Sequence, residues 1–218
     1  MQLANLPGDE TELRQRQYIA KSMLMIVSAT VASYVIAFFL TFYESVPNWF
    51  PSAVDGAVHS IAGAFLALAI RSNGSSLDAG RSQPVRNVAF GFSICYSLLA
   101  LCRLVVAITV GPIWGMVLAM EVVALAAFAL SFRFFLYDSW HGRLRWASQM
   151  VLLLLFAMLS RLFLNLVYNV LIPIRWHDYS SAVMERLQRV ALATGGVDLV
   201  LAGSALCLCF ILWPKRSS

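Results

Sequence analysis

The sequence predicts an all-α integral membrane protein, a helical bundle of about six transmembrane helices, with seven as the alternative. Two observations predict this fold. The chain of 218 residues is 60% hydrophobic and only 12% charged, whereas a soluble domain needs a charged surface. Its apolar residues also gather into six runs, each close to the roughly 20 residues that cross a bilayer. Because lipid offers no hydrogen-bond partner to the backbone, each run must be helical.

The positions of these runs define the predicted spans. The first begins at residue 22, after a polar segment, which is too late and too long for a cleaved signal peptide, so we predict a retained signal anchor. The second is short and carries Asp55 and His59, which makes it the weakest of the six. The third and fourth are joined by a turn at Gly111-Pro112. The predicted spans cover residues 22–43, 54–70, 87–110, 113–134, 147–172 and 189–213.

Lysine and arginine residues are concentrated in alternate connections. The connection after the first span and the Gly111-Pro112 turn contain none, and only the loop before the sixth span dilutes the pattern. The positive-inside rule then predicts that both termini are cytoplasmic. We therefore predict a cytoplasmic N-terminal segment (1–21), a single transmembrane helical domain (22–213) and a basic cytoplasmic tail (214–218). The sequon at Asn73 falls on the cytoplasmic side, where it should stay unmodified, and a signal anchor fits the endoplasmic reticulum or another endomembrane.

Several classes of function are excluded by what the sequence lacks. The four cysteines lie inside the third and sixth predicted spans, so neither a disulfide framework nor a zinc site is predicted. Nucleotide-binding, protease and RNA-binding motifs are absent from the sequence. We expect no cofactor, and the expected partners are the lipid bilayer and a hydrophobic small molecule rather than nucleic acid. The sequence leaves the oligomeric state open.

Four ionisable residues lie at one depth in four different spans. Counted from the nearest span end at 1.5 Å per residue, Arg103, Glu121, Arg161 and Asp198 each lie about 13–15 Å deep. A charge at the bilayer centre costs about 2.5–3.5 kcal/mol on insertion scales, so we expect the four to be paired. The predicted pairs are Arg103 with Glu121 and Arg161 with Asp198, although depth alone does not exclude an exchange of partners.

Polar and aromatic side chains extend this layer into a predicted chamber. Asn165 and Tyr168 follow the fifth-span arginine at i+4 and i+7, so they continue one polar stripe. Tyr96 and Trp114 lie two helical turns from the charged residues of the third and fourth spans. The alternative is that the ion pairs only specify helix packing. The candidate site comprises two catalytic carboxyls, Asp198 and Glu121, and six residues for substrate binding or charge pairing, Arg103, Arg161, Asn165, Tyr168, Tyr96 and Trp114.

A second group of polar residues lies on the second predicted span. Asp55 and His59, at i and i+4, could form a carboxylate-oriented histidine. Both lie near the predicted outer interface, where solvated polar residues are common, so we favour that interpretation. Gly56, Ser60 and Ala64, at four-residue spacing, are typical of a close helix-packing face.

Three stretches, LALAIRSNG, FSICYSLLALCRLVVAI and MLSRLFLNLVYNVL, carry a resemblance to a known group. They resemble fungal multi-pass membrane proteins that have an R-x-x-G loop, an arginine in the next span and a later span with an arginine and a tyrosine. The group often has an acidic pair at the start of its last span, where this sequence has Glu185 and then Asp198. The matching positions are Arg71 to Gly74, Arg103, Arg161 and Tyr168.

Some members of this group are similar to the ascochlorin-type membrane-bound terpene cyclases. The resemblance implies a cofactor-independent cyclase of fungal-type secondary metabolism, which protonates an epoxide or alkene of a prenylated substrate. A carboxylate that is paired with arginine is a poor proton donor, so only one of Glu121 and Asp198 can supply the proton. We predict Asp198, because Gly195 and Gly196 leave room beside it for a bulky chain.

Two other functions stay open on the sequence. Arg103, Gly111 and Glu121 resemble, more faintly and at a different spacing, fungal seven-span lipid-translocating proteins. The alternative is therefore a lipid or small-molecule translocator that uses the same charged layer, although the sequence shows no inverted repeat or paired broken helices. The third possibility is a non-catalytic membrane protein of a biosynthetic pathway.

Overall fold

The computed structural model describes residues 7–42, 47, 49–72, 79–111, 113–139, 145–167 and 181–213. Within these ranges the chain forms six long helices, each with a stretch long and apolar enough to cross a membrane. The prediction of a multi-pass helical membrane protein with six spans is confirmed. The helices are α1 (Pro7–Phe42), α2 (Phe50–Arg71), α3 (Ala79–Thr109), α4 (Trp114–Arg133), α5 (Arg145–Leu166) and α6 (Ser181–Leu212), and a π-helical segment, η1 (Phe134–Ser139), continues α4.

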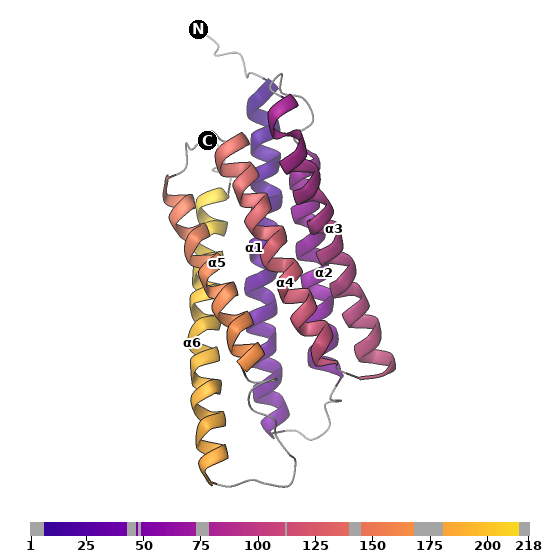
Figure 1. Cartoon of the computed structure of the whole chain (residues 1–218), viewed down its shortest axis with the longest axis vertical. Helices are drawn as coiled ribbons and strands as arrows, with labels where there is room; N and C mark the ends of the chain where they lie inside the picture. Colours follow the sequence, from indigo (N-terminus) through magenta and orange to yellow (C-terminus); the bar gives the residue numbers. More distant parts are fainter. Residues whose placement is uncertain are drawn as a thin grey trace.

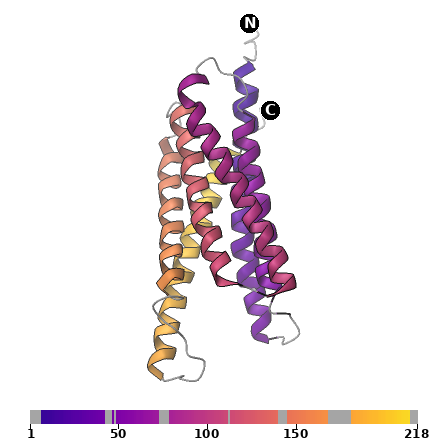
Figure 2. The same cartoon turned by 45° about the vertical axis from the view of Figure 1, so that its right-hand side comes forward.

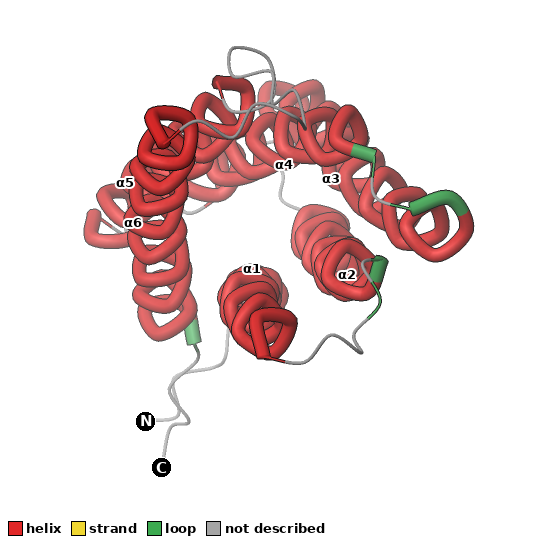
Figure 3. The backbone as a smooth tube through the Cα atoms, turned by 90° about the horizontal axis from the view of Figure 1, so that it is seen from below, coloured by secondary structure: helices red, strands yellow, loops and turns green. Residues whose placement is uncertain are grey.

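The six helices pack as a ring in which each contacts its neighbour in sequence and α6 returns to contact α1. Seen along the bundle, α3 to α6 form an arc that curves around α1 and α2 (Figure 3). The beginning of α1 and the end of α6 lie at the same end of the bundle (Figure 1). At the other end, the first turns of α6 project past the beginning of α4 (Figure 2). The charged side chains described below lie inside this ring.

The first helix differs most from its predicted bounds. It begins at Pro7, inside the segment predicted to precede the membrane, and proline is well suited to a helix start. Ile19, Ala20 and Met23 are fully buried, and the ring of Tyr18 stacks on that of Phe65 from α2. One apolar face packed on α2 is thus enough to extend the helix beyond the continuous apolar run from which the span was predicted.

The helices α2 and α3 approach each other unusually closely. A Cβ atom on Gly56 would lie 2.8 Å from the backbone oxygen of Ala100, and one on Gly63 would lie 2.8 Å from the backbone nitrogen of Ser97. The Ser60 hydroxyl lies 3.3 Å from that of Ser97, which itself donates to the backbone oxygen of Ser60 at 2.8 Å. The predicted packing face is therefore present, but Gly63 completes it.

Ala64, which was predicted to belong to that face, is exposed on the outside of the bundle. The reason is the helical period of 3.6 residues, by which the contact line drifts from a strict four-residue spacing and meets Gly63 instead.

Candidate functional site

The charged residues of the bundle form two clusters. The first, which we call the Asp55 cluster, joins α2 to α3. Arg103 donates a hydrogen bond from Nη1 to Asp55 Oδ2 and another from Nε to Ser52 Oγ at 3.2 Å. The other carboxylate oxygen of Asp55 lies 3.3 Å from Nε2 of His59, and Nδ1 of His59 shares a hydrogen bond with the Tyr96 hydroxyl. All of these side chains except Arg103 belong to buried residues.

The predicted pairing of Arg103 with Glu121 is wrong. Nη1 of Arg103 does lie 3.8 Å from the sulfur of Met120, the neighbour of Glu121 in the sequence, but Arg103 pairs with Asp55 and Glu121 with Arg161. The physical reason is the close approach of α2 to α3 at Gly56, which brings the neighbouring carboxylate alongside Arg103. Asp55 is 6% exposed, so the interpretation of it as a solvated interfacial residue is also wrong.

The second cluster, which we call the Arg161 cluster, joins α4, α5, α6 and α1. Nε of Arg161 lies 3.3 Å from Glu121 Oε1 and 3.5 Å from Asp198 Oδ1. Asn165 donates from its amide nitrogen to both carboxylate oxygens of Glu121, at 2.8 Å and 3.0 Å. The Tyr34 hydroxyl donates to Asp198 Oδ2 at 3.1 Å. The predicted contact between Arg161 and Asp198 is confirmed, and Asn165 does belong to the charged group.

The Arg161 cluster is looser than the Asp55 cluster and is not balanced in charge. The two carboxylates share one guanidinium, because the second arginine of the layer is taken by Asp55. Nε of Arg161 and Oδ1 of Asp198 are both buried, and neither has a hydrogen-bond partner in the described part of the chain. The contact between them is therefore an electrostatic one without hydrogen-bond geometry.

A small cavity lies at the centre of the bundle, between the two clusters. Its volume is about 30 Å³, which is room for water but not for a prenyl chain. Side chains from all six helices line it: Ile26 from α1, His59 from α2, Tyr96 from α3, Met120, Glu121 and Ala124 from α4, Met158 and Arg161 from α5, and Leu201 from α6.

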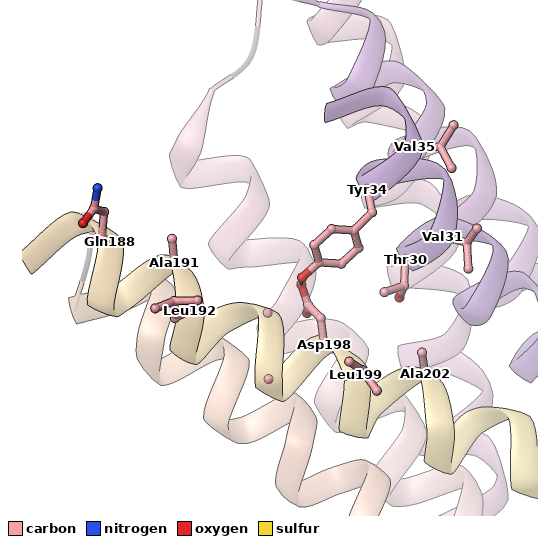
Figure 4. Close-up of a pocket in the computed structure, with 12 residues that line it drawn as sticks. Thr30, Val31, Tyr34, Val35, Gln188, Ala191, Leu192, Asp198, Leu199 and Ala202 are labelled. Atoms are coloured by element: carbon pink, nitrogen blue, oxygen red, sulfur yellow. Dashed lines mark hydrogen bonds between the residues drawn. The ribbon is translucent and has the colours of Figure 1, made fainter. Parts of the chain in front are cut away.

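A much larger groove of about 950 Å³ runs between α1 and α6. Figure 4 shows Tyr34 reaching from α1 across this groove, with its hydroxyl directed at the Asp198 carboxylate on α6. Gly195 and Gly196 form part of the α6 wall; a Cβ on Gly195 would lie 3.5 Å from the Tyr34 hydroxyl, and one on Gly196 would contact nothing within 4 Å. Asp198 is the carboxyl-bearing residue of the lining. The other lining residues are mostly apolar: Thr30, Val31, Val35, Gln188, Ala191, Leu192, Leu199 and Ala202.

The aromatic residues of the predicted chamber have different positions in the structure. Tyr96 is fully buried and packs edge-to-face on Phe128 with a centroid distance of 5.9 Å, so it borders the central cavity and not the groove. Trp114 is the first residue of α4, is 59% exposed and lines neither space. A helix-end position is typical of tryptophan in membrane proteins, which explains why its spacing from Glu121 was misleading. Tyr168 lies outside the described residues.

The sequence analysis did not identify Tyr34, and it interpreted Asp55 and His59 as solvated interfacial residues and not as part of the candidate site. No local signal marks Tyr34, because a lone tyrosine in an apolar span is common at any depth. A signal for Asp55 was present in its neighbour Gly56, since a glycine beside a carboxylate marks a place where another helix can come close to it. His59 lies one helical turn after Asp55, so the signal that marks Asp55 applies to His59 as well.

The described residues hold no group of three or more His, Cys, Asp or Glu side chains that could bind a metal ion. The four cysteines are free thiols, with Cys95, Cys102 and Cys207 exposed on the outside of the bundle and Cys209 buried. Compared with known proteins, the chain matches no protein-family model, no curated protein and no solved structure. The resemblance to the fungal group therefore stays a prediction.

Proposed function

We propose that this protein is a membrane-embedded cyclase that acts on a prenylated, hydrophobic substrate of fungal-type secondary metabolism. The observation that carries the proposal is the groove of about 950 Å³ between α1 and α6 with a carboxyl, Asp198, on its wall. The volume is that of a typical small-molecule site. Because both helices belong to membrane spans, a substrate dissolved in the bilayer would reach the groove without crossing water.

The two carboxylates of the Arg161 cluster suit different roles. One guanidinium faces two carboxyls, so a single proton on the pair makes the three groups neutral together. Glu121 accepts two hydrogen bonds from Asn165 and lies away from the groove, which suits the counter-ion of Arg161 during turnover. Asp198 lines the groove, which suits the proton donor. Environments that separate two neighbouring carboxyls in this way are typical of acid catalysis.

The proposed reaction needs no cofactor. The carboxyl O–H of Asp198 transfers its proton to an epoxide oxygen or alkene carbon of the substrate and leaves a carboxylate, which Arg161 and the Tyr34 hydroxyl stabilise. The next alkene of the chain attacks the cationic carbon and closes a ring. The final cation then returns one proton to the Asp198 carboxylate as a new double bond forms, so the product is an isomer of the substrate. The Tyr34 ring, which spans the groove, offers an aromatic face to the cation.

The test is turnover of candidate prenylated substrates by membranes that contain only this protein. Asp198→Asn keeps the shape of the side chain but removes the acid, and we expect it to lower turnover by about 10²–10⁴-fold without loss of folded protein. Glu121→Gln is the matched control, and its main defect should be in stability. Equal, wild-type activity in both variants would contradict acid catalysis. Substrate that is moved across the membrane but recovered unchanged would favour the alternative, a translocator that uses the same groove.

We further propose that both termini are cytoplasmic and that the protein resides in the endoplasmic reticulum or another endomembrane. Basic residues at the end of the bundle where α1 begins support this orientation. Arg14, Arg16, Arg71, Arg133 and Arg145 lie in described segments at that end, whereas Arg186 and Arg189 lie near the beginning of α6 at the other. Asn73 lies outside the described residues.

A further inference from the structure

The central cavity has two polar residues, His59 and Tyr96, for which the proposed protonation has no use. His59 and Tyr96 lie on one side of it, and Glu121 and Arg161 on another. Its volume of about 30 Å³ exceeds the roughly 10–15 Å³ that one water molecule requires, and polar partners are available on both sides. The cavity therefore has the size and the chemistry of a buried water site between the two charge clusters.

The hydrogen bonds of His59 determine in which direction a proton can move along this side of the cavity. Asp55, as the counter-ion of Arg103, is an acceptor, so the nearby Nε2 of His59 carries a hydrogen. In neutral His59, Nδ1 then accepts the hydrogen bond of the Tyr96 hydroxyl. A base oriented by a carboxylate and bonded to a hydroxyl is the arrangement in which that hydroxyl can exchange its proton.

We propose that the central cavity holds a water molecule and that a relay from His59 through Tyr96 and this water supplies the single proton that the Glu121–Asp198 pair holds before turnover begins. In the loaded state His59 is an imidazolium. On unloading, its Nδ1 proton passes to the Tyr96 oxygen as the Tyr96 hydroxyl proton passes to the water. The water passes one proton on to the Glu121–Asp198 pair. One proton leaves the imidazole and one arrives on a carboxylate, while Tyr96 and the water each gain one and lose one.

The surroundings of His59 fit this role on every side. Asp55 on its own helix and Tyr96 and Arg103 from α3 contact it or its carboxylate partner. Across the cavity α4 contributes Glu121 and α5 contributes Arg161, whereas α1 and α6 face it with the apolar Ile26 and Leu201. At 1.5 Å per residue, Asp55 lies about 8 Å and His59 about 14 Å from the first residue of α2, so the carboxylate partner of His59 lies between the imidazole and that end of the bundle.

This inference rests on the proposed function, because it concerns the proton of Asp198. The measurement is infrared spectroscopy of the protein in lipid vesicles, where the C=O stretch of a protonated carboxyl shifts when deuterium replaces its proton. The band of Asp198 is identified by its loss in Asp198→Asn. We expect Tyr96→Phe, which removes the hydroxyl, and Ala124→Val, which fills the cavity, to slow deuterium exchange about tenfold or more. Tyr18→Phe and Ala126→Val are matched controls away from the cavity and should exchange at the wild-type rate.

Each outcome bears on a different part of the proposal. Wild-type exchange in both Tyr96→Phe and Ala124→Val would overturn the relay and leave the proposed acid untouched. Slow exchange in the two controls as well would also overturn it, because the effect would then not depend on the cavity. If no protonated-carboxyl band disappears in Asp198→Asn, the proposed function and the relay both fail. If Tyr96→Phe does not fold, the deuterium exchange rate of Ala124→Val alone still tests the relay.

Discussion

The two sides of the bundle hold buried charge in different ways. On the α2–α3 side, Asp55 and Arg103 form a one-to-one pair, and close helix contact at Gly56 leaves no space beside it. On the α1–α6 side, Arg161 is shared by two carboxylates, and the neighbouring helices enclose a groove spanned by Tyr34. The same residue types are thus used once in a sealed contact and once beside an open space.

This difference separates structure from function better than the mere presence of charge does. A buried pair with matched partners and close packing needs no further ligand; the Asp55–Arg103 pair specifies how two helices meet and also positions His59. A cluster with one cation for two carboxyls, next to a space of molecular size, fits the proposed site, which needs a proton to exchange and room for a reactant. Three sets of substitutions test whether the two sides differ as described.

The largest loss of stability is expected on the α2–α3 side. Arg103→Met leaves the Asp55 carboxylate buried without its cation and should lower the free energy of unfolding by about 3–5 kcal/mol. Adding Asp55→Leu should recover part of this loss, though not all, because His59 then loses a partner. Unfolding by denaturing detergent in mixed micelles measures these changes, with Arg86→Met at the start of α3 as the control. Purely additive losses in the double variant would contradict the pairing.

A smaller difference is expected between two glycines. An alanine at Gly56 would place its Cβ 2.8 Å from the Ala100 oxygen and 2.9 Å from the Leu104 nitrogen, so the two backbones must separate, at a cost of about 1–3 kcal/mol. Gly196→Ala meets nothing within 4 Å and should leave stability unchanged or raise it by about 0.5–1 kcal/mol, because alanine favours the helix. The same unfolding assay compares them, and equal losses would mean that the groove is not open.

The smallest effect is expected from the contact that spans the groove. Tyr34→Phe removes one hydrogen bond to Asp198 and should cost about 0.5–1.5 kcal/mol. Tyr18→Phe, on the same helix, is the control, since its ring stacks on Phe65 and should keep most of its contribution without the hydroxyl. If Tyr34→Phe destabilised the protein as much as Arg103→Met, the α1–α6 side would be as tightly sealed as the other.

The fold and half of the charged layer follow from the sequence, for identifiable reasons. The length and polarity of each apolar run determine whether it can span a membrane, and each of the six predicted spans overlaps one helix of the described part of the chain. Residue counting from span ends gives depth, and depth was enough to bring Arg161 and Asp198 together. These are properties of single helices, which the local sequence determines.

The partner of Arg103 could not be found in this way, because depth does not tell which way a side chain points around its helix. That direction is decided by how α2 packs on α3, and the contact at Gly56 decided it in favour of Asp55. The groove could not be predicted from the sequence either. Gly195 and Gly196 indicated space, but the opposite wall and Tyr34 come from α1, which is far from α6 in the sequence.

The order of the charges along the chain has a consequence for biosynthesis. Asp55 and Arg103 lie on consecutive helices, so their pair can form as soon as the α2–α3 hairpin is in the membrane. A nascent chain that ends before α6 already holds a matched pair of Arg161 with Glu121, but it lacks both Asp198 and one wall of the groove. The helix α6 therefore brings the proposed acid and encloses its binding space in a single event, so no chain that ends before α6 carries the proposed site.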